Sequence, residues 1–193
     1  KQVSLDFEPD NNLVDGPVYI FHSDYDDSFY MQYWGDTWGS GATYTVHENA
    51  PEYAPFSRVI KLKSGTNWGY GAGIAWGNEQ QNAINSSANN YAQFFVNPTG
   101  FSSVEVIVQS FSQPESKVTY PMSAGEPMDN GWLKFEVQIP TVEDLSWFGL
   151  VFAADQQSEV LLSNVSLINK QVDLSKPSTP APVPTVNDTE VFS

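Results

Sequence analysis

The sequence predicts an all-β protein, built as an antiparallel β-sandwich of the jelly-roll type. Three observations lead to this fold class. About ten short stretches alternate apolar and polar residues with a period of two, as half-buried strands do. Turn residues, mainly Gly, Pro, Asn and Asp, separate these stretches, and no stretch has a convincing helical period. The 193 residues suffice for one domain with a full core.

The alternation also predicts where the strands lie and which faces they bury. The buried faces are clearest in the later strands, where Val104, Val106, Val108, Phe135, Val137, Ile139, Phe148, Leu150 and Phe152 point inward. A glycine-broken aromatic stretch covers 29–39, a polar loop is expected over 78–90, and 114–130 is mostly loop with room for a short strand at 118–120. The expected strands are 3–8, 18–21, 44–46, 58–62, 68–76, 91–96, 104–111, 132–139, 147–152 and 160–168.

The expected strand 68–76 has an unusual composition, with large side chains on one face and almost none on the other. Trp68, Tyr70, Ala72, Ile74 and Trp76 share one face, whereas Gly69, Gly71, Gly73 and Ala75 share the other. Alternating glycines mark a place where another group approaches the backbone closely. That group is either a neighbouring element packed on the strand, which is the more ordinary arrangement, or a ligand in a groove with aromatic walls. Trp76 is the first choice for a core tryptophan.

The composition changes at Gln171. The segment 176–185 is rich in Pro, Thr and Ser and offers little apolar surface to bury. We therefore expect residues 1–170 to form a β-sandwich module and residues 171–193 to be a linker that leads to a further domain.

The charge of the chain excludes several classes of partner. The formal net charge is −15, from 23 acidic and 8 basic residues, so nucleic acid and anionic membranes would be repelled. Arg58 is the only arginine, and the chain has no cysteine and therefore no disulfide or thiolate site. Such acidity is compatible with a salt-rich marine setting. We expect a monomer.

Carbohydrate binding is the function that the residues favour. The C–H faces of sugars pack on aromatic rings, and their hydroxyl groups need amide and carboxylate partners. Aromatic side chains make up 14% of the chain. Trp147 alternates away from the buried Phe148, and Trp34 and Trp38 lie among glycines, where a core position is harder to explain. The candidate binding residues are Trp34, Trp38, Asn67, Trp68, Tyr70, Gln93, Gln109, Trp132, Glu136, Gln138 and Trp147.

Two other classes of function remain open. A small jelly-roll glycoside hydrolase needs two carboxylates across a groove, and Glu105 with Glu136 is the nearest pair in the sequence. A structural or adhesive domain of a surface protein would bury its tryptophans.

His22 and His47 lie near turns and are interpreted as surface residues. The acidic turn 24–27 lacks the EF-hand pattern.

The two ends of the domain carry a family resemblance. Residues 3–8, which end in Asp-Phe-Glu, and residues 162–167, Leu-Ser-Asn-Val-Ser-Leu, resemble the first and last strands of galactose-binding-like β-sandwich carbohydrate-binding modules. The Gly-Tyr-Gly-Ala-Gly-Ile-Ala segment at 69–75 is similar to the non-catalytic domains of bacterial polysaccharide hydrolases. The resemblance implies a structural calcium held by Asp6, Glu8 and Asn164, although Ser163 stands where the family pattern is acidic.

Together these observations predict a non-catalytic module of a secreted or cell-surface bacterial protein. Its ligand would be a neutral or weakly charged β-linked polysaccharide, such as a β-glucan or a marine galactan like agarose. Its covalent partner would be a catalytic domain, a glycoside hydrolase or a lyase, for which it serves as an accessory domain.

Overall fold

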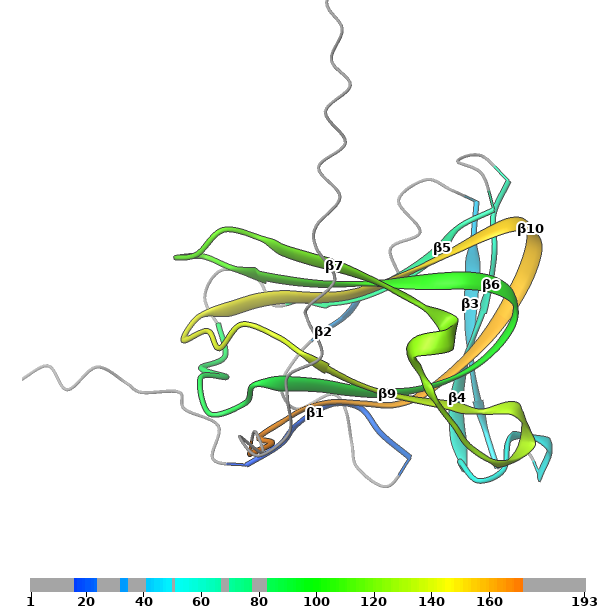
Figure 1. The fold of residues 1–193 in the computed structure, drawn as a ribbon, viewed down its shortest axis with the longest axis horizontal. Helices are drawn as coiled ribbons and strands as arrows, with labels where there is room; N and C mark the ends of the chain where they lie inside the picture. Colours follow the sequence, from blue (N-terminus) through cyan, green and yellow to red (C-terminus); the bar gives the residue numbers. More distant parts are fainter. Residues whose placement is uncertain are drawn as a thin grey trace, which may run out of the picture.

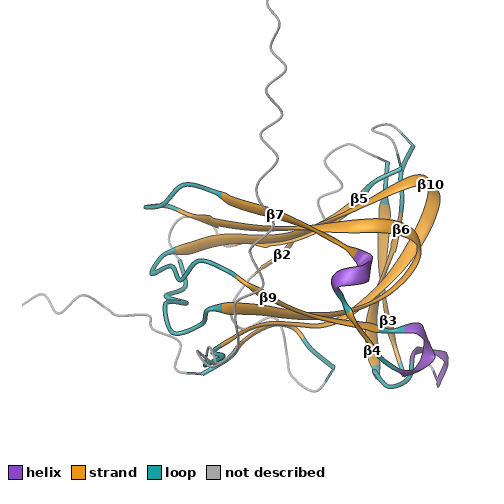
Figure 2. Cartoon of the chain, viewed as in Figure 1, coloured by secondary structure: helices purple, strands orange, loops and turns teal. Residues whose placement is uncertain are grey.

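The computed structural model describes residues 16–23, 32–34, 41–49, 51–66, 70–77 and 83–171, with the main chain alone at 32–34. The predicted strand at 3–8, the acidic turn at 24–27, most of the aromatic stretch at 29–39 and the linker after Gln171 lie outside the described residues. The described part is almost entirely strand (Figure 2), with single turns of 3-10 helix at Pro51–Tyr53, Met122–Ala124 and Asp129–Gly131. No helix among the described residues is long and apolar enough to cross a membrane.

Ten strands are described, and most of them lie where the alternation predicts. Their bounds are β1 Val18–Phe21, β2 Gln32–Trp34, β3 Thr43–Glu48, β4 Arg58–Lys63, β5 Ala72–Gly77, β6 Tyr91–Ser110, β7 Ser116–Pro121, β8 Glu126–Pro127, β9 Leu133–Gln138 and β10 Leu145–Ile168.

Two of these strands, β6 and β10, run through both layers of the sandwich, where the sequence predicts four separate strands. They pair with each other almost from end to end, with Leu145 opposite Ser110 and Ile168 opposite Tyr91. Both bend at the same place (Figure 1), where residues 155–158 of β10 stand against the single Gly100 of β6. Gly100 has a φ of 78°, a left-handed conformation that glycine adopts at little cost. The bend therefore needs no break in either strand.

The bent strands divide the molecule into two layers (Figure 1). The upper layer contains β7, the second half of β6, the first half of β10, β5 and β2, in that order. The lower layer contains β8, β9, the first half of β6, the second half of β10 and β1. Near the bend β4 also pairs with β10, and β3 pairs with β4. All of these pairings are antiparallel, which confirms the predicted β-sandwich.

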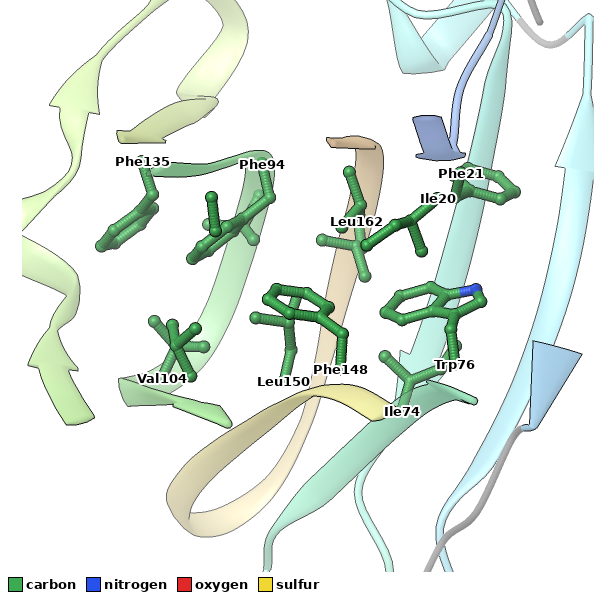
Figure 3. Packing of buried hydrophobic residues seen from close by; sticks show 14 of the residues in the cluster. Ile20, Phe21, Ile74, Trp76, Phe94, Val104, Phe135, Phe148, Leu150 and Leu162 are labelled. Atoms are coloured by element: carbon green, nitrogen blue, oxygen red, sulfur yellow. The ribbon is translucent and has the colours of Figure 1, made fainter. Parts of the chain in front are cut away.

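The core lies between the layers and is filled by alternate side chains of the strands (Figure 3). Phe94 and Phe135 of the lower layer stack with ring centroids 5.0 Å apart. Trp76, predicted as a core tryptophan, is 1% exposed, and its ring lies 6.4 Å from that of Phe148. The inward residues predicted in 104–108, 135–139 and 148–152 are all buried.

A second, smaller cluster of buried residues covers the outside of the lower layer. It consists of Tyr53, Phe56, Val59 and Trp132, with Phe95 packed against it. The short segment 51–56 supplies two of these rings and folds over the sheet, so the tryptophan beneath it is shielded from water.

Candidate functional site

The outer face of the upper layer, here called the upper outer face, presents Trp147 on its middle strand, β10, close to the end of the layer where β5 and β6 stop. Trp147 of β10 lies opposite Gln109 of β6 on one side and Gly77 of β5 on the other. Its neighbours Phe148, Leu150 and Phe152 alternate into the core, so Trp147 points outward as predicted and is partly exposed. The other residues that alternate to this side of the sheet are Gly73, Ala75, Glu105, Ile107, Lys117, Thr119, Gly149 and Val151. Of these, Gly73, Ala75, Ile107 and Gly149 are buried.

The indole of Trp147 lies against the backbone of two glycines. A Cβ atom added to Gly149 would stand 2.6 Å from Cη2 and 2.7 Å from Cζ3 of Trp147, and one added to Gly77 would stand 2.8 Å from Cδ1. These distances are too short for any side chain larger than hydrogen. The two glycines therefore set the position of the ring, which leans along β10 towards Gly149.

Polar groups line the face beside this ring. The Gln109 side-chain amide donates a hydrogen bond to the Glu115 carboxylate, and Lys117 Nζ lies 2.9 Å from the other oxygen of Glu115. The hydrogen bond from Lys117 lowers the pKa of Glu115, and the same contact raises the pKa of Lys117. Amide and carboxylate groups held next to an aromatic ring provide what a sugar requires.

The contact between Gly149 and Trp147 gives a direct test of the ring position. We expect Gly149→Ala to push the indole out of place, because the methyl group would occupy its space. Glycan binding should weaken several-fold, whereas Tm should change little, since the displaced indole lies outside the core. Affinity electrophoresis together with thermal unfolding checks both. Unchanged binding in a Gly149→Ala variant would show that the ring position is unimportant.

Five other residues predicted at the site precede β5 in the chain, and the structure describes only some of them. Trp34 lies opposite Ala75 in the register of β2 with β5, which brings its main chain to the edge of the upper layer. Trp38, Asn67 and Trp68 lie outside the described residues. Tyr70 is 38% exposed, but it precedes β5 and lies about 20 Å along the chain from Gly77.

Three further predicted residues lie on the opposite side of the sandwich. Gln93, Glu136 and Gln138 belong to the lower layer, where Gln93 pairs with Glu136 and Tyr91 with Gln138. The Gln93 amide donates to Glu136 Oε1 at 2.9 Å, Lys134 Nζ lies 2.8 Å from the same oxygen, and Lys170 contacts the second oxygen. The carboxylate is thus occupied by partners within the protein.

This arrangement also removes the carboxylate pair on which the hydrolase alternative depended. Glu105 faces outward from the upper layer and Glu136 faces outward from the lower layer, so no groove contains both. The hydrogen bonds from Lys134 and Lys170 lower the pKa of Glu136 to about 2, which leaves it ionised and unsuited to act as a general acid.

The low pKa of Glu136 predicts a pH-dependent stability. Because its folded pKa lies below the ordinary value of 4.5, its contribution is complete above that value and is lost as the pH falls towards 2. Glu136→Gln should lower the free energy of unfolding by about 1–3 kcal/mol at neutral pH. The difference from wild type should shrink between pH 4.5 and pH 2, as measured by urea unfolding. A difference independent of pH would contradict this account.

The structure corrects the prediction for Trp132. Its side chain is 1% exposed, and its Nε1 donates a hydrogen bond to the carbonyl of Ala54 at 3.1 Å. The ring packs edge-on against Phe56 at 4.6 Å. Neither face of the indole is available to a sugar, so Trp132 belongs to the second cluster and not to a binding site.

Of the three predicted calcium ligands, only Asn164 lies within the described residues. Asp6 and Glu8 lie outside them. Asn164 has a φ of 45°, and its Oδ1 already accepts hydrogen bonds from the Ser23 amide at 2.8 Å and the Ser163 hydroxyl at 3.3 Å. No cluster of three His, Cys, Asp or Glu side chains suited to a metal occurs in the described ranges. Calcium binding stays a prediction that depends on Asp6 and Glu8.

Two polar residues near Trp147, Glu115 and Lys117, were not predicted from the sequence. Glu115 and Lys117 lie in a segment expected to be mostly loop, whereas β7 pairs there with β6. The alternation of Lys117 and Thr119 with Val118 and Tyr120 was the available signal.

Comparison with solved structures defines the class of fold. No protein-family model matches the sequence, and no curated protein matches it. A mutant of a family 29 carbohydrate-binding module is similar over 82% of this chain and 97% of its own, with 13% identity and a TM-score of 0.51. A family 11 carbohydrate-binding module of a cellulosomal cellulase of Clostridium thermocellum is similar over 81% and 96%, with 9% identity and a TM-score of 0.51.

A third similar structure is an exo-β-agarase, with 10% identity and a TM-score of 0.53. The match includes 83% of this chain but only 26% of the agarase chain. The chain thus has the β-sandwich fold found in carbohydrate-binding modules, as its terminal strands suggested. Identities this low establish the fold and leave the function to be argued from the residues.

Proposed function

We propose that this protein is a carbohydrate-binding module whose ligand lies on the upper outer face. One observation carries the proposal: Trp147 is partly exposed on the side of the sheet away from the core, and Gly77 and Gly149 hold its ring against the backbone. A tryptophan fixed in this way is a rigid platform that loses little conformational entropy when a ligand packs on it.

The polar groups around this platform match the hydroxyl groups of a sugar. Gln109 lies opposite Trp147, and its amide has an oxygen that can accept a hydrogen bond. Glu105 and Glu115 add carboxylates on the same face, and Lys117 is the cation among them. Two carboxylates and one ammonium group give this part of the face a net negative charge.

We further propose that the ligand is a neutral or weakly charged β-linked polysaccharide, either a β-glucan or a galactan such as agarose. The negative charge at the site and the net charge of −15 both disfavour sulfated or uronate chains. Similar folds support the same direction: one variant of a family 29 module, with a TM-score of 0.50 to this chain, is described in complex with mannohexaose.

The role we propose is that of an accessory module in a secreted or cell-surface bacterial enzyme. The Pro-rich segment 176–185 is typical of a linker between domains. In the similar exo-β-agarase the matching part is about a quarter of the chain, which supports attachment to a larger polysaccharide-degrading enzyme. Tethering would raise the local concentration of the catalytic domain at its substrate. The module itself would catalyse no reaction.

Native affinity electrophoresis of the whole chain tests the function. Gels containing laminarin, mixed-linkage glucan, agarose, xylan or alginate are compared with a gel without polysaccharide, and reducing ends are assayed in parallel. We expect retardation by a neutral glucan or galactan without release of reducing ends. Retardation by alginate alone would overturn the ligand class, and release would indicate an enzyme. No retardation in any gel would favour a structural or adhesive domain.

A further inference from the structure

Phe111 is an exposed aromatic residue that packing does not explain. It follows the last residue of β6 and is 49% exposed, the highest value among the exposed large hydrophobic residues of the described chain. The other two, Val46 and Tyr70, are 42% and 38% exposed. A single exposed apolar residue is common on protein surfaces, so a role for Phe111 depends on its place beside the proposed site.

The register places Phe111 on the same face as Trp147. Leu145 is fully buried and lies opposite Ser110, so both of these residues point towards the core. The amide of Phe111 donates to the carbonyl of Asp144 at 3.4 Å, which continues the ladder by one residue. Strand residues alternate between faces. Gln109 and Phe111 therefore both lie on the upper outer face.

The separation of the two aromatic residues sets the length of ligand that can reach both. Trp147 lies opposite Gln109, and Phe111 is two residues after Gln109, just beyond the end of β6, so the two Cα atoms are about 8 Å apart on the diagonal. The indole of Trp147 leans towards Gly149, which is away from Phe111. Because the indole extends away from Phe111, one or two sugar units stacked on it do not reach Phe111, whereas a longer chain does.

The surroundings of Phe111 suit the same kind of ligand. Asp144 lies beside it, and one oxygen of its carboxylate accepts a hydrogen bond from the Ser112 hydroxyl at 2.9 Å. The second oxygen can accept a bond from a sugar hydroxyl. Each of the two aromatic residues thus has a polar neighbour on the segment with which it pairs, Gln109 for Trp147 and Asp144 for Phe111.

We propose that Phe111 is a second aromatic contact for the polysaccharide, and that the bound glycan runs along β6 from Trp147 to Phe111. This inference rests on the proposed function, since it concerns the same site. It deepens that function by assigning the ligand as an internal segment of several sugar units, because the two rings are too far apart for a monosaccharide.

The test compares wild type, Phe111→Ala and Phe111→Tyr, with Val46→Ala as the matched control. Val46 is an exposed apolar residue on β3, away from this face. Calorimetry measures the affinity for glucan or agarose oligosaccharides of two and of six units, chosen to match the polysaccharide that retards the wild-type chain. Thermal unfolding of each variant shows that it is folded.

We expect Phe111→Ala to weaken hexasaccharide binding about three- to tenfold and to leave the weak disaccharide binding unchanged. Phe111→Tyr and Val46→Ala should behave as wild type. If Phe111→Ala binds both oligosaccharides as wild type does, the second contact is refuted while the proposed function stands. If wild type binds no glycan, the proposed function itself fails.

Discussion

Trp147→Ala is expected to weaken glycan binding at least tenfold and to leave the fold intact. The expected loss is about 1.4 kcal/mol or more, because the ring is the rigid aromatic platform at the centre of the proposed site. The cost in stability is limited to about 1–2 kcal/mol, since Trp147 lies outside the core and is already partly exposed. Affinity electrophoresis and calorimetry measure the first quantity, and urea unfolding measures the second.

The conservative variant Trp147→Phe provides the control for this prediction. It keeps an aromatic ring of smaller area on the two glycines and should retain part of the affinity. Tyr70→Ala tests the exposed tyrosine outside the upper outer face. If Trp147→Ala binds as wild type while Tyr70→Ala does not, the glycan lies elsewhere on the molecule.

Trp132→Ala should give the opposite pattern, with a large loss of stability and unchanged binding. The variant removes a fully buried indole from the cluster of Tyr53, Phe56 and Val59 and deletes the hydrogen bond to Ala54. Emptying such a site costs about 3–5 kcal/mol. For a domain of this size, that loss lowers Tm by roughly 6–20 °C. Urea and thermal unfolding measure the loss.

Binding by the folded fraction is measured at low temperature, where the variant remains folded. Trp132→Phe restores most of the packing without the hydrogen bond and should recover more than half of the lost stability. If Trp132→Ala abolished binding while its unfolding curve matched that of wild type, our assignment of Trp132 to the second cluster would be incorrect. The two tryptophan variants together separate a binding role from a structural one.

The alternation of residues was sufficient to predict most of the fold. It identified the buried faces of 104–108, 135–139 and 148–152, because each of these strands has one face towards the core and one face away from it. It failed where a strand bends. Pro98 and Gly100 are typical of a turn between two strands, and so are residues 155–158, but β6 and β10 pair on both sides of the bend, with a register shift between Ala154 and Glu159. There the two strands are continuous because each forms hydrogen bonds with a strand distant in sequence, and the local sequence does not indicate such bonds.

The candidate site, like the fold, could be predicted only in part. Trp147 could be placed on the outer side because its immediate neighbours are so strongly apolar. Trp132 could not be placed, because the segment that covers it comes from residues 51–56, far away in the sequence. Gln93 and Gln109 have similar local sequences, yet they lie on opposite layers, since the bend in β6 falls between them. Phe111 followed the outward pattern of Glu105, Ile107 and Gln109, but its position at the strand end concealed its exposure.

The continuity of β6 and β10 has a consequence for how the chain folds. Residues such as Tyr91 and Ile168 are neighbours in the sheet although β7, β8 and β9 lie between them in sequence. Closing so many distant pairs is slow, and folding on a timescale of about milliseconds to seconds is typical of such topologies. Since both layers share these two strands, we expect that neither layer folds or unfolds while the other stays in its present state. The two layers therefore fold and unfold as one kinetic unit.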